Sequence, residues 1–310
     1  MGSKMKLPAP LVNLDDRADV ILDQLNRQEA LHAYDRMPKF NKESARRNRY
    51  SNIFPYKDNY VRLSPEWGYD CDYMNASHVI LPCRQSFIAT QGPTSSTIPH
   101  FWKMVWQSVH DHGIIVMLTR LQEGLRAKCD LYWPSDPEEP LQIDELLVRC
   151  NQKYEVESVD DCKVLEFVLE KGQEKKTIYH FYYTEWSDFR TPKASSICSL
   201  LLFVKSLAHR VRFHKSPIII HCSAGCGRTG TFMALFEIIT RIEFRFASDQ
   251  LLESIPEIVY CLRMQRMQSV QSAEQLIFLY IMCYELLQMP FPKVPELKAA
   301  YPPIYHKIRN

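Results

Sequence analysis

The sequence predicts an α/β domain, with a twisted, mostly mixed β-sheet flanked by helices. Three observations support this. Short strand-like runs alternate with apolar segments of helical period along the 310-residue chain, which indicates helices covering a sheet. No internal repeat or flexible Gly/Ser linker divides the chain, so we expect a single domain. One apolar strand, at 217–220, leads directly into a glycine-containing loop and then an apolar helix.

The first predicted element is a helix over residues 15–35. Acidic residues at its start suit the positive end of a helix, and Ala18, Ile21, Leu22 and Leu25 share one face. Runs typical of strands follow at 87–90, 113–118, 154–157, 164–169 and 177–183. Further helices are predicted at 101–110, 197–210, 229–242 and 273–287.

The composition is that of an ordinary globular chain. Hydrophobic residues make up 46%, enough for one large core, and the formal net charge is only +2. So small an excess of positive charge predicts no general attraction to nucleic acid or to a membrane surface. The longest apolar run, 197–204, is too short to span a bilayer.

The even number of cysteines raises the question of a disulfide framework, which we reject. The cysteines are scattered over a long chain, and the first residues lack the apolar core of a signal peptide. We therefore expect free thiols and a reducing, cytoplasmic environment. The ten are Cys71, Cys83, Cys129, Cys150, Cys162, Cys198, Cys222, Cys226, Cys261 and Cys283.

The most informative segment spans residues 220–230 and reads IHCSAGCGRTG. Gly225 and Gly227 have no Cβ, so the loop can curl with its backbone N–H groups pointing inward. Such a ring of amides at a helix N-terminus suits a phosphate dianion. The same field favours a thiolate at Cys222, which makes its sulfur a nucleophile. Arg228 can bind two phosphate oxygens as a planar fork.

The alternative for Cys222 is a buried structural cysteine before a glycine turn. The complete spacing His-Cys-x5-Arg-Thr-Gly, with a strand before it and a helix after it, favours the functional interpretation. No Gly-Lys-Ser/Thr is present, which excludes a Walker-type nucleotide loop.

This segment resembles the signature of protein tyrosine phosphatases, and the resemblance continues in order over about residues 41–284. The matching blocks are NRYxxIxPY at 48–56, DYMNAS at 72–77, IATQGP at 88–93, FWxMVW at 101–106, IVMLT at 115–119, YWP at 132–134 and QSAEQ at 271–275. It implies a classical, phosphotyrosine-specific catalytic domain of the non-receptor type, with neither cofactor nor metal. We expect an N-terminal helical extension (1–40), a catalytic core (41–290) and a C-terminal tail (291–310).

The resemblance also implies the catalytic roles. Cys222 is the nucleophile that forms a cysteinyl-phosphate, and Arg228 binds the phosphate. Asp188, on a mobile loop over 183–192, is the general acid that protonates the departing phenolate. Gln271 positions the water that hydrolyses the intermediate, and Thr229 donates a hydrogen bond to the departing sulfur.

Other matched positions are implied to support these groups. His221 orients the phosphate-binding loop from behind, and Glu123 positions Arg228. Lys128 pairs with Asp188 when the loop that carries Asp188 closes, and Gln275 organises water. Tyr50 forms an aromatic wall that fits a phosphotyrosine ring but leaves phosphoserine short of the sulfur. The remaining expected substrate contacts are Asn52, Ser223, Ala224, Gly225, Cys226 and Gly227.

Four positions depart from the family pattern. Ser187 stands where the family has proline, and Arg190 where glycine is common. Because proline restricts φ, serine should loosen the acid loop, and we expect Ser187→Pro to speed turnover. Asn52 replaces an aspartate that binds peptide backbone. Gln268 replaces a small residue and should narrow the groove beside the site.

Two other functions stay open. A catalytically weakened phosphotyrosine-binding pseudophosphatase is suggested by the departures in the acid loop, but Cys222, Arg228, Asp188 and Gln271 are all present. A dual-specificity or lipid phosphatase would need a shallower site, against which Tyr50 and the long amino-terminal part argue. We expect phosphotyrosine-containing proteins as partners, no nucleic acid, no membrane span and a monomer.

Two further signals have competing explanations. The basic run Lys42, Arg46, Arg47 and Arg49 is either a solvated face or a surface that steers acidic phosphopeptides. The cysteines at 129 and 226 are either core residues or partners that could trap an oxidised nucleophile as a disulfide.

Overall fold

The computed structural model describes residues 9–136, 138–155, 159, 162–187, 191–210 and 215–288. Within these ranges the strands are β1 (Tyr60–Arg62), β2 (Tyr73–Ile80), β3 (Ser86–Thr90), β4 (His112–Met117), β5 (Gln122–Glu123), β6 (Arg126–Ala127), β7 (Leu141–Ile143), β8 (Leu146–Glu155), β9 (Cys162–Lys171), β10 (Glu174–Tyr183) and β11 (Ile218–His221). The α-helices are α1 (Leu14–Ala33), α2 (Lys42–Arg46), α3 (Ile98–Ser108), α4 (Ala194–Ala208), α5 (Gly227–Glu243), α6 (Ser248–Glu253), α7 (Ile255–Arg263) and α8 (Ala273–Gln288). Short 3-10 turns occupy Ala9–Leu11, Tyr34–Arg36, Pro65–Trp67 and Ser95–Thr97.

The sheet is mixed, as predicted. Its strand order is β1-β2-β3-β11-β4-β10-β9-β8-β7, and β5 pairs with β6 in a separate hairpin. The central strands β3, β11, β4 and β10 run parallel, whereas the pairings on either side of them are antiparallel. The strand β11 therefore lies in the middle of the parallel part, and its carboxyl end leads through a short loop into helix α5.

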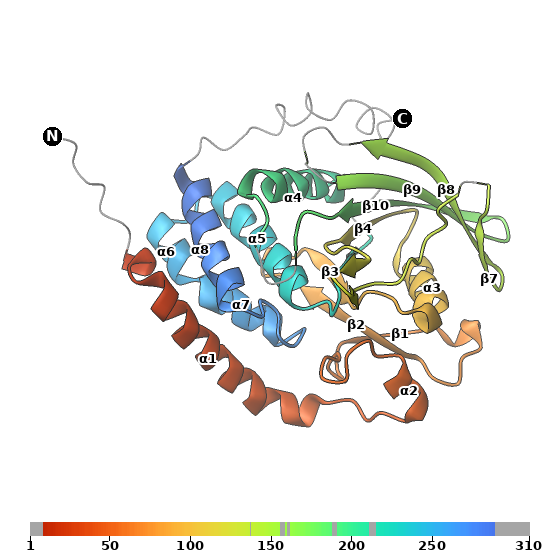
Figure 1. Ribbon diagram of the computed structural model, residues 1–310, viewed down its shortest axis with the longest axis horizontal. Helices are drawn as coiled ribbons and strands as arrows, with labels where there is room; N and C mark the ends of the chain where they lie inside the picture. Colours follow the sequence, from red (N-terminus) through yellow and green to blue (C-terminus); the bar gives the residue numbers. More distant parts are fainter. Residues whose placement is uncertain are drawn as a thin grey trace.

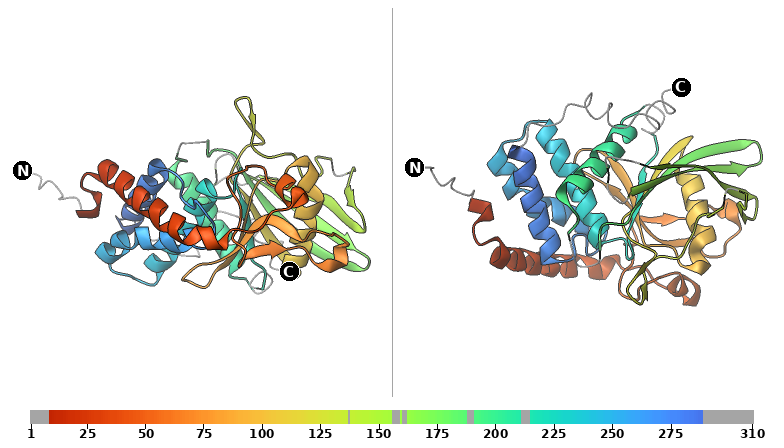
Figure 2. Two further views of the ribbon diagram at one scale, coloured as in Figure 1. Left: turned by 90° about the horizontal axis from the view of Figure 1, so that it is seen from below. Right: turned by 45° about the horizontal axis from the view of Figure 1, so that its top comes forward.

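Helices cover both faces of the sheet, with α3 on one face and α4, α5 and α8 on the other (Figures 1 and 2). In β11, Ile218 and Ile220 belong to the core cluster that contains α5 and α8, while Ile219 packs into the cluster that contains Phe101 and Trp102 of α3. Burial on both faces explains why this strand is continuously apolar and does not alternate.

The helix α1 lies along α7 and α8 (Figure 1). Its Ala18 and Leu25 are buried in the same core cluster as Leu276 and Leu279 of α8. The apolar face predicted for residues 15–35 is thus the face that contacts the helical layer, and the described helix ends at Ala33, close to the expected boundary.

Six strands differ from the expectation, and four of them, β1, β5, β6 and β7, are runs of only two or three residues that were not predicted. The strand β2 was not predicted, because Asn75 and Ser77 place polar side chains inside it. The run predicted at 154–157 is only the end of β8, which begins at Leu146, and residues 156–158 lie outside the described residues. The rest of β8 was not predicted, because the mostly polar stretch 149–153 interrupts the alternation of apolar and polar residues. No helix in the described part of the chain has the length and hydropathy needed to cross a bilayer.

Candidate active site

The cradle is a loop of residues 222–228 between β11 and the first turn of α5. Gly225 has φ +72°, and a Cβ there would lie 2.1 Å from the carbonyl oxygen of Thr90. Only glycine fits this position, because the backbone of β3 is too close for any side chain. The predicted curl of the loop is confirmed, and it is shaped by contact with a neighbouring strand.

Arg266, just after α7, binds the outer side of the cradle. Its Nε donates to the carbonyl of Gly225 at 3.1 Å, and its Nη2 donates to the carbonyl of Ala224 at 2.9 Å and to Oδ1 of Asn75 at 2.8 Å. The side chain is fully buried. By holding the carbonyls outward, Arg266 leaves the backbone N–H groups of the loop to face the interior, as an anion nest requires.

Cys222 is buried at the centre of the cradle. Burial alone would raise the pKa of its thiol. The Arg228 guanidinium, the hydroxyl and N–H of Thr229 and the N–H of Gly225 outweigh burial and bring the pKa of Cys222 below the ordinary cysteine value. The buried Thr229 hydroxyl has no other hydrogen-bond partner among the described residues, so its proton is available to the Cys222 sulfur. The arrangement stabilises a thiolate.

Arg228 is held by groups from three other segments. Its Nη1 lies 2.6 Å from Oε1 of Glu123, 2.8 Å from the carbonyl of Trp186 and 3.2 Å from the carbonyl of Leu118. Glu123 also accepts from Nη2 at 3.3 Å. Both partners of the ion pair are largely buried, at 4% and 12% exposure. The expected pairing of Glu123 with the arginine of the cradle is present.

His221 lies behind the cradle in a fully buried polar chain. Its Nδ1 is 2.9 Å from the Cys222 carbonyl oxygen, and its Nε2 is 2.8 Å from the Tyr132 hydroxyl, which also lies 2.6 Å from Nε2 of His180. Burial lowers the pKa of His221 to about 4. The imidazole is therefore neutral near pH 7 and connects the cradle backbone to the sheet.

Tyr50 forms one wall of the site. It packs with Ile53, Cys226 and Met267 in a small apolar cluster, and its hydroxyl lies 2.8 Å from that of Ser223. Ser223 has a single hydroxyl proton, which it donates to the Lys128 carbonyl at 2.6 Å. The Tyr50 hydroxyl is therefore the donor to Ser223, and this bond fixes the ring relative to the cradle.

The two glutamines lie on the other side of the cradle. Oε1 of Gln275 accepts the N–H of Gln271 at 2.8 Å, and a Cβ at Gly227 would lie 2.9 Å from Nε2 of Gln275. The sulfur of Cys226 lies 3.9 Å from Oε1 of Gln271. Burial, then the negative charge of Cys222, raises the pKa of Cys226 to about 12, so its thiol stays protonated.

Other predicted residues are placed less directly. Asn52 is exposed beyond Tyr50, and Lys128 is buried beside Cys129. Asp188 and Arg190 lie outside the described residues, so the assignment of the general acid stays a prediction. Ser187, at the edge of the described part, donates its N–H to the Glu185 carbonyl at 3.1 Å.

The basic run beside Tyr50 divides in the structure. Arg49 turns inward, with Nη2 2.6 Å from Oδ1 of Asp130 and Nε 2.9 Å from the Gly92 carbonyl. Arg47 is also buried, and its Nη1 binds the carbonyls of Cys71 and Tyr73 at 2.9 Å each. Neither explanation offered for the basic run fits Arg47 and Arg49, because both guanidinium groups bind backbone carbonyls inside the protein.

Sequence reasoning missed Arg266 and Tyr132 as parts of the site. Tyr132 belongs to the YWP block and Arg266 lies five residues before the QSAEQ block, but neither was assigned a role. All ten cysteines carry free thiols. Among the described residues no group of His, Cys, Asp and Glu side chains has the arrangement of a metal site.

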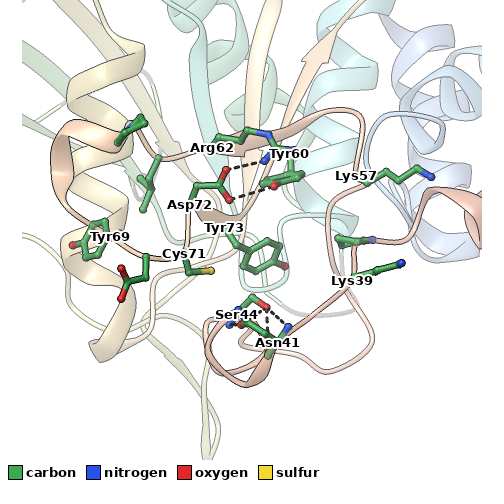
Figure 3. Close-up of a pocket in the computed structure, with 14 residues that line it drawn as sticks. Lys39, Asn41, Ser44, Lys57, Tyr60, Arg62, Tyr69, Cys71, Asp72 and Tyr73 are labelled. Atoms are coloured by element: carbon green, nitrogen blue, oxygen red, sulfur yellow. Dashed lines mark hydrogen bonds and ion pairs between the residues drawn. The ribbon is translucent and has the colours of Figure 1, made fainter.

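A separate cavity of about 720 Å³ lies near α2 and contains none of the predicted site residues. Figure 3 shows its wall, where Arg62 and Tyr60 bind Asp72 above the ring of Tyr73. Lys39 and Lys57 are exposed on its other side. These contacts describe a surface hollow next to helix α2 and suggest no chemistry of their own.

A thiolate in a ring of backbone amides, with a fixed arginine beside it, defines a cysteine-dependent phosphatase. Residues 44–285 match the family model described as protein-tyrosine phosphatase, and the chain belongs to the protein tyrosine phosphatase family. It is 50% identical over 289 residues to tyrosine-protein phosphatase 3 of Schizosaccharomyces pombe, covering 93% of this chain and 95% of that protein. It is 37% identical to tyrosine-protein phosphatase 2 of the same organism, covering 76% of this chain but 33% of that longer protein.

Solved structures agree with this assignment. The structure of PTPN18 in complex with HER2 phosphopeptides superposes with a TM-score of 0.79 at 25% identity, covering 90% of this chain and 98% of that one. The predicted single-domain mixed fold and the non-receptor class are thereby confirmed, and the chain is a protein-tyrosine-phosphatase hydrolase.

Proposed function

We propose that the chain hydrolyses protein phosphotyrosine in two steps through Cys222. In the first step the thiolate attacks phosphorus, the bond to the tyrosine oxygen breaks, and Asp188 gives its proton to the phenolate. In the second step water attacks the cysteinyl-phosphate, its proton returns to the Asp188 carboxylate, and the sulfur leaves as a thiolate. The observation that carries the proposal is the placement of Cys222 in a buried glycine loop next to Arg228, whose guanidinium is fixed by Glu123; these surroundings lower the pKa of Cys222 in spite of burial.

The electrostatics of the cradle favour the transition state in both steps. Negative charge develops on the phosphoryl oxygens, where Arg228 and the inward amides lie. Glu123 fixes the guanidinium before substrate arrives, so little reorganisation is needed during the reaction. Thr229 supplies a hydrogen bond to the sulfur as it leaves.

Tyr50 supports specificity for phosphotyrosine over phosphoserine. Its ring is fixed by Ser223 and by packing on Met267, which places an aromatic wall at the mouth of the cradle. A phosphotyrosine ring can stack on this wall, whereas a phosphoserine is too short to use it while reaching Cys222. The same observation argues against a dual-specificity or lipid phosphatase.

The substrates we propose are phosphotyrosine-containing proteins, acted on by a monomer in the reducing cytoplasm. The free thiols support this compartment, because the nucleophile must stay reduced. PTPN18 binds HER2 phosphopeptides in its solved complex, which supports a phosphopeptide as the ligand of the cradle in this chain.

The test compares turnover of a phosphotyrosine peptide with that of a matched phosphoserine peptide by the purified chain. We expect turnover of the first alone. Cys222→Ser should abolish turnover yet keep peptide binding, since a serine hydroxyl fits the cradle but does not ionise there. Cys261→Ser, a partly exposed cysteine outside the site, is the matched control. Turnover by Cys222→Ser within tenfold of the parent would contradict the nucleophile assignment.

A further inference from the structure

The turn before Gln271 has an uncommon backbone conformation. Gln268 and Val270 have φ values of 54° and 59°, in the left-handed region that residues with a Cβ rarely adopt. Two such residues within three positions persist only where their surroundings hold them. The turn is packed against α5 just behind the cradle, because a Cβ at Gly230 would lie 2.6 Å from the nitrogen of Val270.

Glu29, in the helix α1, binds this turn directly and through a second residue. Its Oε1 accepts the N–H of Gln268 at 2.9 Å, and its Oε2 lies 3.3 Å from Nη1 of Arg263. Arg263 in turn donates to the carbonyls of Ser269 at 3.0 Å and Val270 at 2.9 Å. The carboxylate and the guanidinium together bind three consecutive residues of the turn.

These contacts are shielded from water. Glu29 is 6% exposed and Arg263 is 1% exposed. Burial raises the pKa of Glu29, and Arg263 and the N–H of Gln268 act against that rise. Burying a carboxylate and a guanidinium costs free energy of desolvation, which their mutual attraction and the backbone donor offset. Removing one partner leaves the other charge buried without that compensation.

The turn also fixes the side chain of Gln271. Its Nε2 donates to Oε1 of Gln268 at 2.9 Å, and its Oε1 lies near Cys226 in the cradle. The amide is therefore oriented with its nitrogen toward the turn and its oxygen toward the site. An oxygen on that side can accept a hydrogen bond from the attacking water and direct the water's lone pair at phosphorus.

We propose that Glu29 is a positioning residue for the second chemical step, acting through the Gln268 turn on Gln271. The inference rests on the proposed role of Gln271 in hydrolysis of the cysteinyl-phosphate. It assigns the N-terminal helix a part in turnover, although Glu29 contacts neither the substrate nor the reacting atoms.

Two conservative variants separate this role from a structural one. Glu29→Asp keeps the charge but withdraws the carboxylate from Gln268, whereas Glu29→Gln keeps an acceptor for that N–H but removes the charge that faces Arg263. With an aryl phosphate whose leaving group is acidic, kcat reports hydrolysis of the intermediate and kcat/KM reports its formation. We expect Glu29→Asp to lower kcat by about fivefold, the effect of one weakened hydrogen bond, with kcat/KM unchanged and a larger burst of phenol.

Glu29→Gln should instead keep kcat and lower the thermal midpoint, because the charge of Arg263 becomes unpaired. Asp23→Ala, on the exposed side of the same helix where Asp23 pairs with Arg27, is the matched control and should change neither quantity. Glu29→Asp combined with Gln271→Ala should be no slower than Gln271→Ala alone, since both act on one step through one side chain.

Four results would overturn the inference. A parallel fall of kcat and kcat/KM in Glu29→Asp would show damage to the whole cradle. Multiplying effects in the double variant would show that Glu29 does not act through Gln271. If Gln271→Ala itself leaves kcat unchanged, the role given to Gln271 in the proposed function fails and the inference falls with it, whereas a slow Gln271→Ala beside an unaffected Glu29→Asp overturns the inference alone.

Discussion

The hydroxyl of Tyr50 lies 2.8 Å from that of Ser223, and the bond between them runs from the wall of the site to the floor of the cradle. Tyr50→Phe should keep the stacking surface and lose only this bond, so we expect kcat/KM for a phosphotyrosine peptide to fall by about three- to tenfold. Tyr50→Ala should lower it by about 10²-fold or more through lost ring contact. Steady-state rates on phosphotyrosine and phosphoserine peptides check this. An unchanged ratio of the two in Tyr50→Ala would show that the wall does not select the substrate.

Glu123→Gln should lower kcat/KM by about 10²-fold, because Arg228 loses its charged partner and is no longer fixed for phosphate. The exposed Glu138 offers the matched control Glu138→Gln, which should have no effect. Inorganic phosphate inhibition, which reports the empty cradle, should weaken in parallel. If Glu123→Gln binds phosphate as the parent does, the ion pair has no positioning role.

Asp188→Ala should lower kcat by about 10²- to 10⁴-fold, the range for loss of a general acid. The loss should be much smaller for an aryl phosphate whose leaving group is already acidic, since that phenolate needs no proton. Rates across a series of substituted phenyl phosphates check this. Equal losses on good and poor leaving groups would exclude Asp188 as the proton donor.

Stability should depend on pH through His221. Its pKa is about 4 in the folded protein, against an ordinary value of 6.5, so between these values the unfolded chain binds the extra proton. The stabilisation is therefore complete above about pH 6.5 and is lost as the pH falls toward 4, by up to about 3 kcal/mol. His180, whose pKa burial also lowers, acts in the same direction.

Urea unfolding at several pH values measures this dependence. His221→Asn should flatten it, whereas His110→Asn, a change at a largely exposed histidine, should leave it unaltered. Equal slopes for the two variants would show that the buried histidine chain does not cause the loss of stability in acid.

One contact in the structure argues against the gain in turnover that we expected for Ser187→Pro. Proline at this position would remove the N–H that binds the Glu185 carbonyl at 3.1 Å, next to the carbonyl of Trp186 that contacts Arg228. The closed state would gain about 0.4–1 kcal/mol from the reduced entropy of the open loop, but loss of this hydrogen bond, about 0.5–1.5 kcal/mol, would offset that gain. We now expect turnover equal to or lower than that of the parent, measured as kcat at saturating substrate. A clear gain would show that this turn is absent when the loop closes.

The site residues that could be predicted from the sequence are those that belong to short motifs. Cys222, Arg228 and the glycines between them were predicted from one loop, because they stand at a fixed short spacing in the sequence. Glu123 and Tyr50 followed from the resemblance, and the structure brings both to the cradle.

The parts that were not predicted depend on pairing over long distances. Arg266 holds the carbonyls of residues 42 and 41 positions before it, and Tyr132 meets a histidine 89 positions away. Neither contact produces a recognisable local sequence pattern, because the residues around each partner are those of an ordinary buried segment or helix. The strand β2 escaped notice for the same reason, since its interior polar residues bind partners that only the folded chain supplies.

The carbonyl of Thr90 lies so close to Gly225 that the bend of the cradle is set from outside the loop. A graft of the segment 220–230 into another strand–helix junction would therefore carry the signature residues but lack the neighbouring backbone of Thr90 that bends the loop. A peptide of that sequence should bind phosphate no better than a scrambled one. A graft would need the strand bearing Thr90 and the guanidinium of Arg266 as well, so the smallest portable phosphate site of this fold consists of three segments of chain.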